Sequence, residues 1–175
     1  MLKLTISILL TCLSTFSFSQ TDGYKTLKIG EKLDLTNLVK TDTIIQIADY
    51  GFRLTSKTAQ KFCEIDISYI DVKISEDTTI NMIQVFTNEK IYVDNVEFMK
   101  DFQAVVNCMV NTVGKASYYD AGIDKKDGLI TVAWRFDKSN KLLVLYANSL
   151  SIYEHNGSRH FLIAWAQGSS KTKMW

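Results

Sequence analysis

The sequence predicts an α+β domain in which an antiparallel sheet is packed by one long helix over residues 94–114. Two observations predict this class. Residues 94–114 carry a single apolar stripe with helical spacing, whereas the segments before and after them are short, β-rich and separated by polar turns. Because successive strands are joined by short turns, we expect them to pair antiparallel. The order of elements is also compatible with a diverged internal duplication, although no residue-level repeat supports it.

The long helix has a start signal, a stop signal and one apolar side. Asp94 followed by Glu97 is the acidic form of a capping box, and Gly114 ends the pattern. The apolar residues recur at spacings of three, four and seven and are Phe98, Met99, Phe102, Val105, Val106, Met109, Val110 and Val113. A stripe of this kind is either a core face or a partner-binding surface, and a core face against the sheet is favoured.

The strands expected before the helix cover residues 24–29, 43–47, 62–74 and 79–86. A short helical turn is expected at 34–38. Within 62–74 the alternation changes phase at Ile70, which indicates one extra residue and predicts a β-bulge near Tyr69.

After the helix we expect strands over 115–119, 129–136 and 142–147. Asn156-Gly157 is the strongest dipeptide signal for a two-residue hairpin turn. It predicts that residues 150–155 pair with residues 158–166.

Composition places the chain among globular proteins. It has 175 residues, with 46% hydrophobic and 22% charged side chains and no proline, which disfavours disorder and fits one domain. The formal net charge of +1 gives no electrostatic footprint for nucleic acid.

Residues 1–19 have the pattern of a signal peptide: a lysine at position 3, an apolar run over 4–13, and Ser17 and Ser19 at the positions that signal peptidase reads. We expect cleavage after Ser19 and a periplasmic or secreted product. Lipidation at Cys12 is disfavoured because Thr11 is an unusual residue before a lipidated cysteine. No later segment is apolar enough to span a membrane.

The expected organisation is therefore a signal peptide over 1–19, a flexible lead-in over 20–23, a single α+β domain over 24–167 and a polar C-terminal tail over 168–175. Cleavage leaves Cys63 and Cys108, which could form a disulfide in an oxidising compartment. Cys63 is in phase with Ile65, but Cys108 lies away from the centre of the helix stripe. The alternative is that both cysteines are inert small hydrophobes.

Candidate chemistry is sparse. His155 and His160 flank the Asn156-Gly157 turn and could share a metal with Glu154, but a closed zinc site needs four ligands. Polar residues beside a turn are the favoured interpretation, and no cofactor is predicted.

Four aromatic residues could stack on a sugar, namely Tyr118, Tyr119, Trp134 and Trp165. Core or edge positions are the favoured interpretation for these residues, because aromatics are common in strands. The acidic loop with Asp120 and Asp124 lacks the ligand spacing of a calcium loop.

Residues 94–148 resemble the β-lactamase-inhibitor-like proteins. The likeness lies in Val113-Gly114-Lys115-Ala116-Ser117-Tyr118-Tyr119, a helix end leading into a glycine turn, and in Thr131-Val132-Ala133-Trp134, a strand with an inward tryptophan. The resemblance implies an exported protein-binding scaffold, and no inhibitory residue can be transferred from it.

The functional hypothesis is an exported, soluble, non-catalytic domain of the cell envelope that binds a protein or another ligand. One alternative is a sugar-handling or hydrolytic enzyme that uses Asp120, Asp124 or Glu154. Another is an immunity-type protein that neutralises a toxin. A protein partner in the envelope is expected, and the sequence leaves the oligomeric state open.

Overall fold

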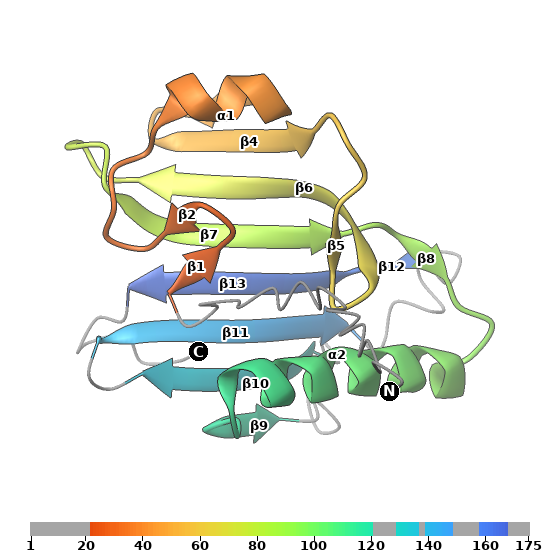
Figure 1. Ribbon diagram of the computed structural model, residues 1–175. Coiled ribbons are helices and arrows are strands. Elements are labelled where there is room, and N and C mark those ends of the chain that lie inside the picture. The colour runs from red at the N-terminus through yellow and green to blue at the C-terminus, as the bar shows by residue number, and fades with distance from the viewer. Residues whose placement is uncertain (1–21, 121–128, 137–138, 149–157, 168–175) are drawn as a thin grey trace, which may run out of the picture.

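A nine-stranded antiparallel sheet forms the body of the molecule in the computed structural model, which describes residues 22–120, 129–136, 139–148 and 158–167 (Figure 1). The spatial order is β3-β4-β6-β7-β13-β11-β10-β9, with β5 paired to β6. Its strands are β3 (Asp42–Ala48), β4 (Gly51–Ser56), β5 (Lys61–Phe62), β6 (Ile65–Ile74), β7 (Ile80–Thr87), β9 (Tyr118–Asp120), β10 (Leu129–Phe136), β11 (Lys141–Asn148) and β13 (Phe161–Gln167).

Two short ribbons and two helices complete the described fold. The ribbons pair β1 (Gly23–Tyr24) with β2 (Leu27–Lys28), and β8 (Lys90–Ile91) with β12 (Ser158–Arg159). The helices are α1 (Leu35–Thr41) and α2 (Asn95–Val113). The mixed fold with an antiparallel sheet matches the predicted class, while the structure has a second, short helix where the sequence indicated only a helical turn.

Each helix precedes four strands that occupy one half of the sheet in chain order. Helix α1 is followed by β3, β4, β6 and β7, and α2 by β9, β10, β11 and β13. The last strands of the two halves, β7 and β13, pair with each other at the centre of the sheet.

Helix α2 begins and ends where its capping residues predict. The Asp94 carboxylate accepts a hydrogen bond from the Glu97 backbone N–H at 2.9 Å, and Gly114 closes the helix with φ at 96°. The buried side is narrower than the predicted stripe, because Met99 and Val110 remain 37% exposed. The residues that enter the core are Phe98, Phe102, Val105 and Met109.

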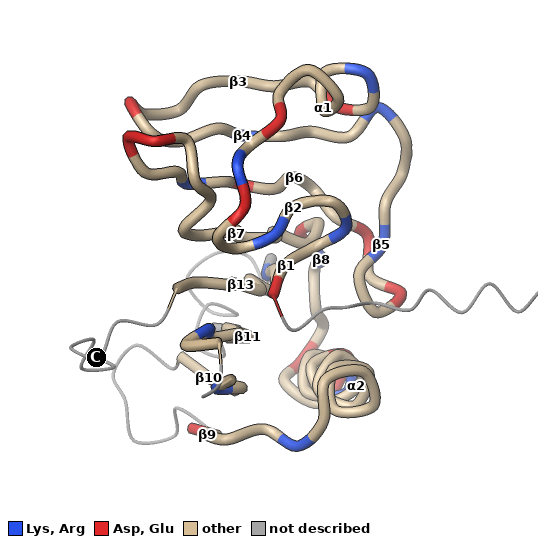
Figure 2. Tube along the Cα trace, turned by 60° about the vertical axis from the view of Figure 1, so that its left-hand side comes forward, with Lys and Arg blue, Asp and Glu red and all other residues tan. Residues whose placement is uncertain are grey.

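One face of the sheet carries both helices, the β1–β2 ribbon and β5; we call it the covered face. Tyr24 of β1 and Phe62 of β5 each lie 6.0 Å from Trp165 of β13, measured between ring centroids. Phe98 of α2 lies 5.7 Å from Phe161 of the same strand. Figure 2, turned by 60°, shows α2 and the β1–β2 ribbon on the same side of the strands. The apolar core therefore lies between the sheet and this single covering layer.

The predicted β-bulge is confirmed. The β6–β7 register shifts between Ile67 and Tyr69. Beyond the bulge Ile70 and Val72 are buried, whereas Ile67 before it is only partly buried. The extra residue re-aims the strand so that its second half points its isoleucines and valine into the core.

Two strand predictions are wrong. Residues 24–29 form a tight hairpin instead of one strand, because the chain reverses at Lys25, where φ is 55°. Residues 161–167 do not pair with 150–155, since both edges of β13 are occupied by β7 and β11. Residues 150–155 themselves lie outside the described residues.

Several predictions concern parts of the chain that the structure does not describe, namely the signal peptide over 1–19 and the tail over 168–175. Of the lead-in over 20–23, Gly23 already belongs to β1. In the described ranges, no helix combines the length and apolarity needed to cross a membrane.

Candidate functional site

A groove runs over the covered face between α1, the β1–β2 ribbon and the segment 57–60. It consists of three adjoining hollows of about 150, 340 and 410 Å³. The first two share Leu54, Thr58, Gln60 and Ile70, and the last two share Thr26, Leu27, Leu38 and Thr41. We call this row of hollows the α1 groove.

The α1 groove exists because α1 cannot fill the space beneath it. The helix has the sequence Leu-Thr-Asn-Leu-Val-Lys-Thr and contains no fully buried residue. Its N-terminus is held instead by Asp34, whose carboxylate accepts from the backbone N–H of Thr36 and Asn37. The floor below is apolar: Leu54 and Ile70 are 1% and 4% exposed. A short polar helix over an apolar floor leaves a site that is apolar inside and polar at its rim.

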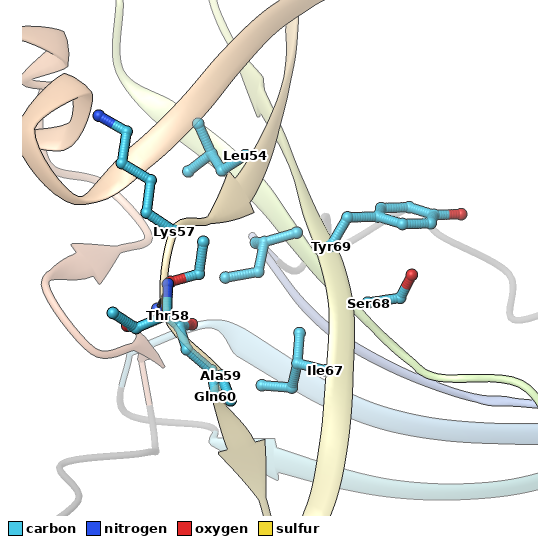
Figure 3. A pocket seen from close by; sticks show the side chains of 10 residues that line it. Leu54, Lys57, Thr58, Ala59, Gln60, Ile67, Ser68 and Tyr69 are labelled. Atoms are coloured by element: carbon cyan, nitrogen blue, oxygen red, sulfur yellow. Dashed lines mark hydrogen bonds between the residues drawn. The ribbon is translucent and has the colours of Figure 1, made fainter.

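Gln60 lines the α1 groove with a buried side-chain oxygen that has no hydrogen-bond partner. Among the described lining residues, it is the only side chain with such an atom. Its amide nitrogen donates to Ser56 Oγ at 2.5 Å, while its oxygen Oε1 is buried without a hydrogen-bond partner. Figure 3 shows Gln60 and Thr58 on one side of the smallest hollow and Ile67 on the other. A buried unpaired carbonyl oxygen is costly, and a turn of the Gln60 side chain toward the hollow would let this oxygen accept a hydrogen bond from a ligand.

Opposite charges stand at the middle hollow, which both Lys25 and Asp42 line. Burial lowers the pKa of the Lys25 ammonium, and the Asp42 carboxylate acts in the opposite direction and raises it. Asp42 is 8% exposed and accepts a hydrogen bond from Thr41 Oγ1 at 2.5 Å. The groove can therefore meet both a donor and an acceptor near its apolar floor.

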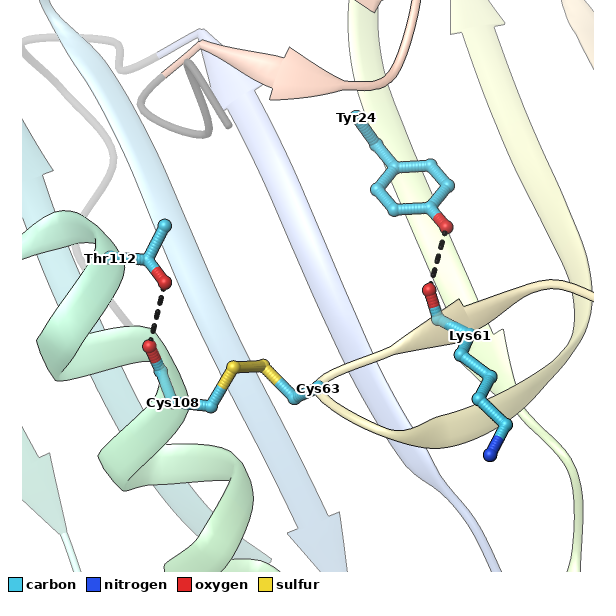
Figure 4. Close-up of a disulfide and its surroundings, with 5 residues drawn as sticks. All are labelled: Tyr24, Lys61, Cys63, Cys108 and Thr112. Carbon is cyan, nitrogen blue, oxygen red and sulfur yellow. Dashed lines mark hydrogen bonds between the residues drawn. A yellow bond between two sulfur atoms is a disulfide. The ribbon is translucent and has the colours of Figure 1, made fainter. Parts of the chain in front are cut away.

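The two predicted cysteines are joined in the structure. Cys63 and Cys108 form a disulfide with a Cα–Cα distance of 5.8 Å, which ties the β5–β6 turn to α2 (Figure 4). Cys63 lies in the turn between β5 and β6 and packs partly buried against the core, and the disulfide joins this turn to Cys108 of α2. Cys108 lies away from the centre of the apolar stripe of α2, and the β5–β6 turn meets α2 at this position.

The β5–β6 turn has an unusual backbone. Cys63 and Glu64 have φ angles of 47° and 65°, the left-handed region that non-glycine residues adopt at a cost. Beside the turn, the Tyr24 hydroxyl donates to the Lys61 carbonyl oxygen at 3.3 Å (Figure 4). The disulfide, β5 and the β1 wall of the α1 groove are thus mechanically connected.

The predicted metal residues are not brought together in the described structure. His160 is exposed, with its ring 5.9 Å from the ring of Phe86, while His155 and Glu154 lie outside the described residues. Within the described ranges, no group of three or more histidine, cysteine or acidic residues could hold a metal ion.

The aromatic candidates divide into two pairs. Trp134 and Trp165 are each 1% exposed, and the Trp134 indole donates to the Gly114 carbonyl oxygen at 2.7 Å. The two tryptophans thus occupy core positions, the interpretation that the sequence favoured, and their buried indoles do not face a ligand. Tyr118 and Tyr119 are 44% and 56% exposed on the edge strand β9. The Tyr118 hydroxyl donates to Asp120 at 3.1 Å, and Asp124 lies outside the described residues.

Of the candidate site residues that the sequence suggested, none that the structure describes lines the α1 groove. The only local sequence signal for the groove was the short helical turn predicted at 34–38. Its mixed polar composition is typical of a helix that has too few apolar residues to bury one side. Gln60 carries no signal in the sequence, because its role depends on the path of the chain between β4 and β5.

No protein-family model matches the chain, and none of the curated proteins or solved structures matches it significantly. Function is therefore inferred from the α1 groove itself.

Proposed function

We propose that this chain is an exported, non-catalytic binding domain that holds an extended segment of a protein partner in the α1 groove. Three hollows that adjoin one another in succession suit a chain whose side chains enter one after another, as those of an extended peptide do. The apolar floor supplies affinity, and a few polar groups supply orientation.

Gln60 Oε1 is the observation that carries the proposal. Leaving a buried acceptor unpaired costs about 1–3 kcal/mol, and a peptide backbone N–H placed in the groove would remove that cost. Lys25 and Asp42 offer a donor and an acceptor beside it. A peptide is the ligand class that presents N–H and C=O groups between apolar side chains.

The lining of the groove favours binding over catalysis. Among the described residues that line it, none is a histidine or a cysteine. A hydroxyl nucleophile activated by a histidine base, or a cysteine nucleophile, is therefore not assembled there.

Export is the second part of the proposal. Residues 1–19 act as a cleavable signal peptide, and the mature chain begins at Gln20. The Cys63–Cys108 disulfide supports this assignment, because disulfides persist mainly in oxidising compartments. The mass of the exported chain would test the cleavage point directly.

We further propose that the two halves of the fold are a diverged duplication of a helix followed by four strands, the long helix α2 being the counterpart of α1. The repeated order of elements and the β7–β13 pairing at the centre support it. The resemblance to the β-lactamase-inhibitor-like proteins supports a protein-binding role for such a scaffold, as an analogy of fold.

The groove is tested by filling it. A random peptide library is panned on the oxidised mature chain, and the affinity of a selected peptide is measured for wild type, Thr58→Trp and Thr55→Trp. Thr58 is exposed and lines two of the hollows, whereas Thr55 is exposed on β4 but does not line the groove. We expect Thr58→Trp to weaken binding at least about tenfold, or about 1.4 kcal/mol, and Thr55→Trp to leave it unchanged.

Failure to enrich any peptide, or equal affinity for the two tryptophan variants, would reject the groove as the binding site. Turnover of a glycan or ester panel by the mature chain would reject a purely binding role.

A further inference from the structure

Strand β3 forms an edge of the sheet, and its register with β4 is regular from Asp42 to Gln46 and shifts between Gln46 and Ala48. It lies at the end of the strand order and pairs only with β4 among the described strands. Proteins usually guard such edges with charged side chains, proline or very short strands. β3 has seven residues, and the stretch from Thr43 to Ala48 contains no charge and no proline. Figure 2 shows β3, with this uncharged stretch, at the outer edge of the sheet. The opposite edge, β9, has only three residues and ends in Asp120.

Apolar side chains line the face of β3 that points away from the α1 groove. Ile45 and Ile47, which alternate along the strand, are 54% and 44% exposed. Tyr50 in the following turn is 48% exposed. These residues are large hydrophobics beside free backbone groups of an edge strand, which is the combination that favours addition of another strand.

The neighbouring charge does not oppose an apolar contact. Arg53 is the β4 residue directly opposite Ile45. Its guanidinium donates two hydrogen bonds of 2.8 Å to Asp71 and lies 3.8 Å from the centroid of the Tyr69 ring. The positive charge of Arg53 is therefore neutralised by Asp71 within the sheet. Next to Ile45, the surface is formed by the guanidinium of Arg53, which stacks on Tyr69.

We propose that β3 pairs antiparallel with β3 of a second copy of this chain, about a twofold axis through Ile45. In that register Ile45 faces its own counterpart and Ile44 faces Gln46. Thr43 faces Ile47 at the end of the paired stretch, where the β3–β4 register shifts. No charged side chain is placed opposite another, and the formal net charge of +1 gives almost no repulsion between copies. The two sheets then form one continuous sheet across the dimer.

A second copy is the occupant that the strand itself specifies. The partner strand must be at least as long as β3, uncharged along its centre and β-branched at alternate positions, and β3 meets each requirement. An isologous interface of this kind closes after two subunits, because each copy offers a single β3. The α1 groove lies on the covered face, and of the β3 residues only Asp42 lines it.

The test is sedimentation velocity of the oxidised mature chain from about 1 to about 500 μM, with hydrogen exchange measured at both ends of this range. A single strand pair with its flanking side chains is a small interface, so we expect a dissociation constant of about 10–100 μM. Amides of residues 42–48 should become protected as the dimer forms, and no other described segment should change.

Ile45→Lys and Val93→Lys form the matched pair of variants. Both replace an exposed β-branched residue, since Val93 is 88% exposed ahead of α2. Ile45→Lys should raise the dissociation constant at least about tenfold, because it sets two lysines opposite each other on the axis. Val93→Lys should leave it unchanged, and Ile47→Lys should repeat the loss if Ile45→Lys proves unstable.

A chain that stays monomeric at 500 μM would overturn the proposal. A dimer that protects another segment, or that is insensitive to both isoleucine variants, would overturn it too. Protection of 42–48 only on adding a foreign peptide would assign the edge to a different partner. None of these outcomes bears on peptide binding in the α1 groove, which Thr58→Trp tests separately.

Discussion

Arg53 and Arg159 each hold a guanidinium against an aromatic ring, but their polar partners differ. Arg53 donates two hydrogen bonds to Asp71, which raise the pKa of Arg53 above its usual value. Arg159 is 3% exposed, and burial lowers its pKa. Among the described residues its side chain donates only to Asn95 Oδ1, at 3.2 Å, and its Nε and Nη1 are buried without a partner.

Replacing each arginine by methionine should lower the free energy of unfolding in one case and leave it unchanged or raise it in the other. Arg53→Met leaves the Asp71 carboxylate, 6% exposed, without its counter-charge and should cost about 2–3 kcal/mol. Arg159→Met removes two unpaired buried nitrogens and keeps an unbranched chain beside Phe98, so stability should be unchanged or rise by about 1 kcal/mol. Urea unfolding of both variants checks this. Loss of several kcal/mol in Arg159→Met would mean that the guanidinium has a strong partner.

At the scale of an element, the β1–β2 ribbon is the wall of the α1 groove, and its geometry requires particular residues. A Cβ on Gly23 would lie 2.0 Å from the Leu27 carbonyl oxygen, so only glycine fits there. The ribbon is anchored by Tyr24, whose ring is fully buried between Phe62 and Trp165. This wall of the α1 groove therefore depends on Gly23 and on the neighbouring buried Tyr24.

Burial raises the pKa of Tyr24 to about 12, and this makes the stability of the fold depend on alkaline pH. An unfolded tyrosine has a pKa of about 10, so Tyr24 stabilises the folded state fully below pH 10 and loses that contribution as the pH rises toward 12. Between pH 9 and pH 11 the loss should be about 1 kcal/mol for this residue.

Urea unfolding of wild type and Tyr24→Phe at pH 9, 10 and 11 measures the effect. The variant should start about 1 kcal/mol lower, because the hydrogen bond to the Lys61 carbonyl oxygen is lost, and should then decline less steeply. Parallel profiles for the two proteins would show that Tyr24 ionises as easily in the folded state as in the unfolded one.

Elements with local signals could be predicted from the sequence. The helix over 94–114 has its cap, its stop and its apolar side within one segment, and the bulge near Tyr69 is written in the alternation around it. The β1–β2 ribbon and the central place of β13 could not be predicted in the same way. The ribbon depends on a backbone contact between Gly23 and Leu27, and β13 is placed by partners about 20 and 80 residues away.

The candidate site was hidden for the same reason. Leu27, Leu38 and Gln60 line the α1 groove because β2, α1 and the segment 57–60 meet there, and none of these residues belongs to a motif. The pairing of Cys63 and Cys108 could be predicted because two cysteines in an exported chain can form a disulfide with each other. The tryptophans were visible as aromatics, but only the fold shows that their indoles are enclosed.

For the whole molecule, the Cys63–Cys108 disulfide joins the two halves of the fold. Cys63 lies between strands of the first half, and Cys108 lies in α2, which precedes the strands of the second half. The halves otherwise meet through β7 and β13 at the centre of the sheet and through the packing of the covered face. The disulfide thus closes a long loop and fixes the strained β5–β6 turn against a helix.

Breaking this bridge should lower the free energy of unfolding by up to about 4 kcal/mol, the loop-closure value for cysteines separated by 45 residues. Denatured mature protein should titrate with no free thiol before reduction and two after it. Cys63→Ser, Cys108→Ser and the double variant should all lose the same stability in urea, because either change alone removes the whole cross-link. Losses that add from the single variants to the double variant would mean that each cysteine contributes only its own packing. Two free thiols without reduction would show that the bridge is absent.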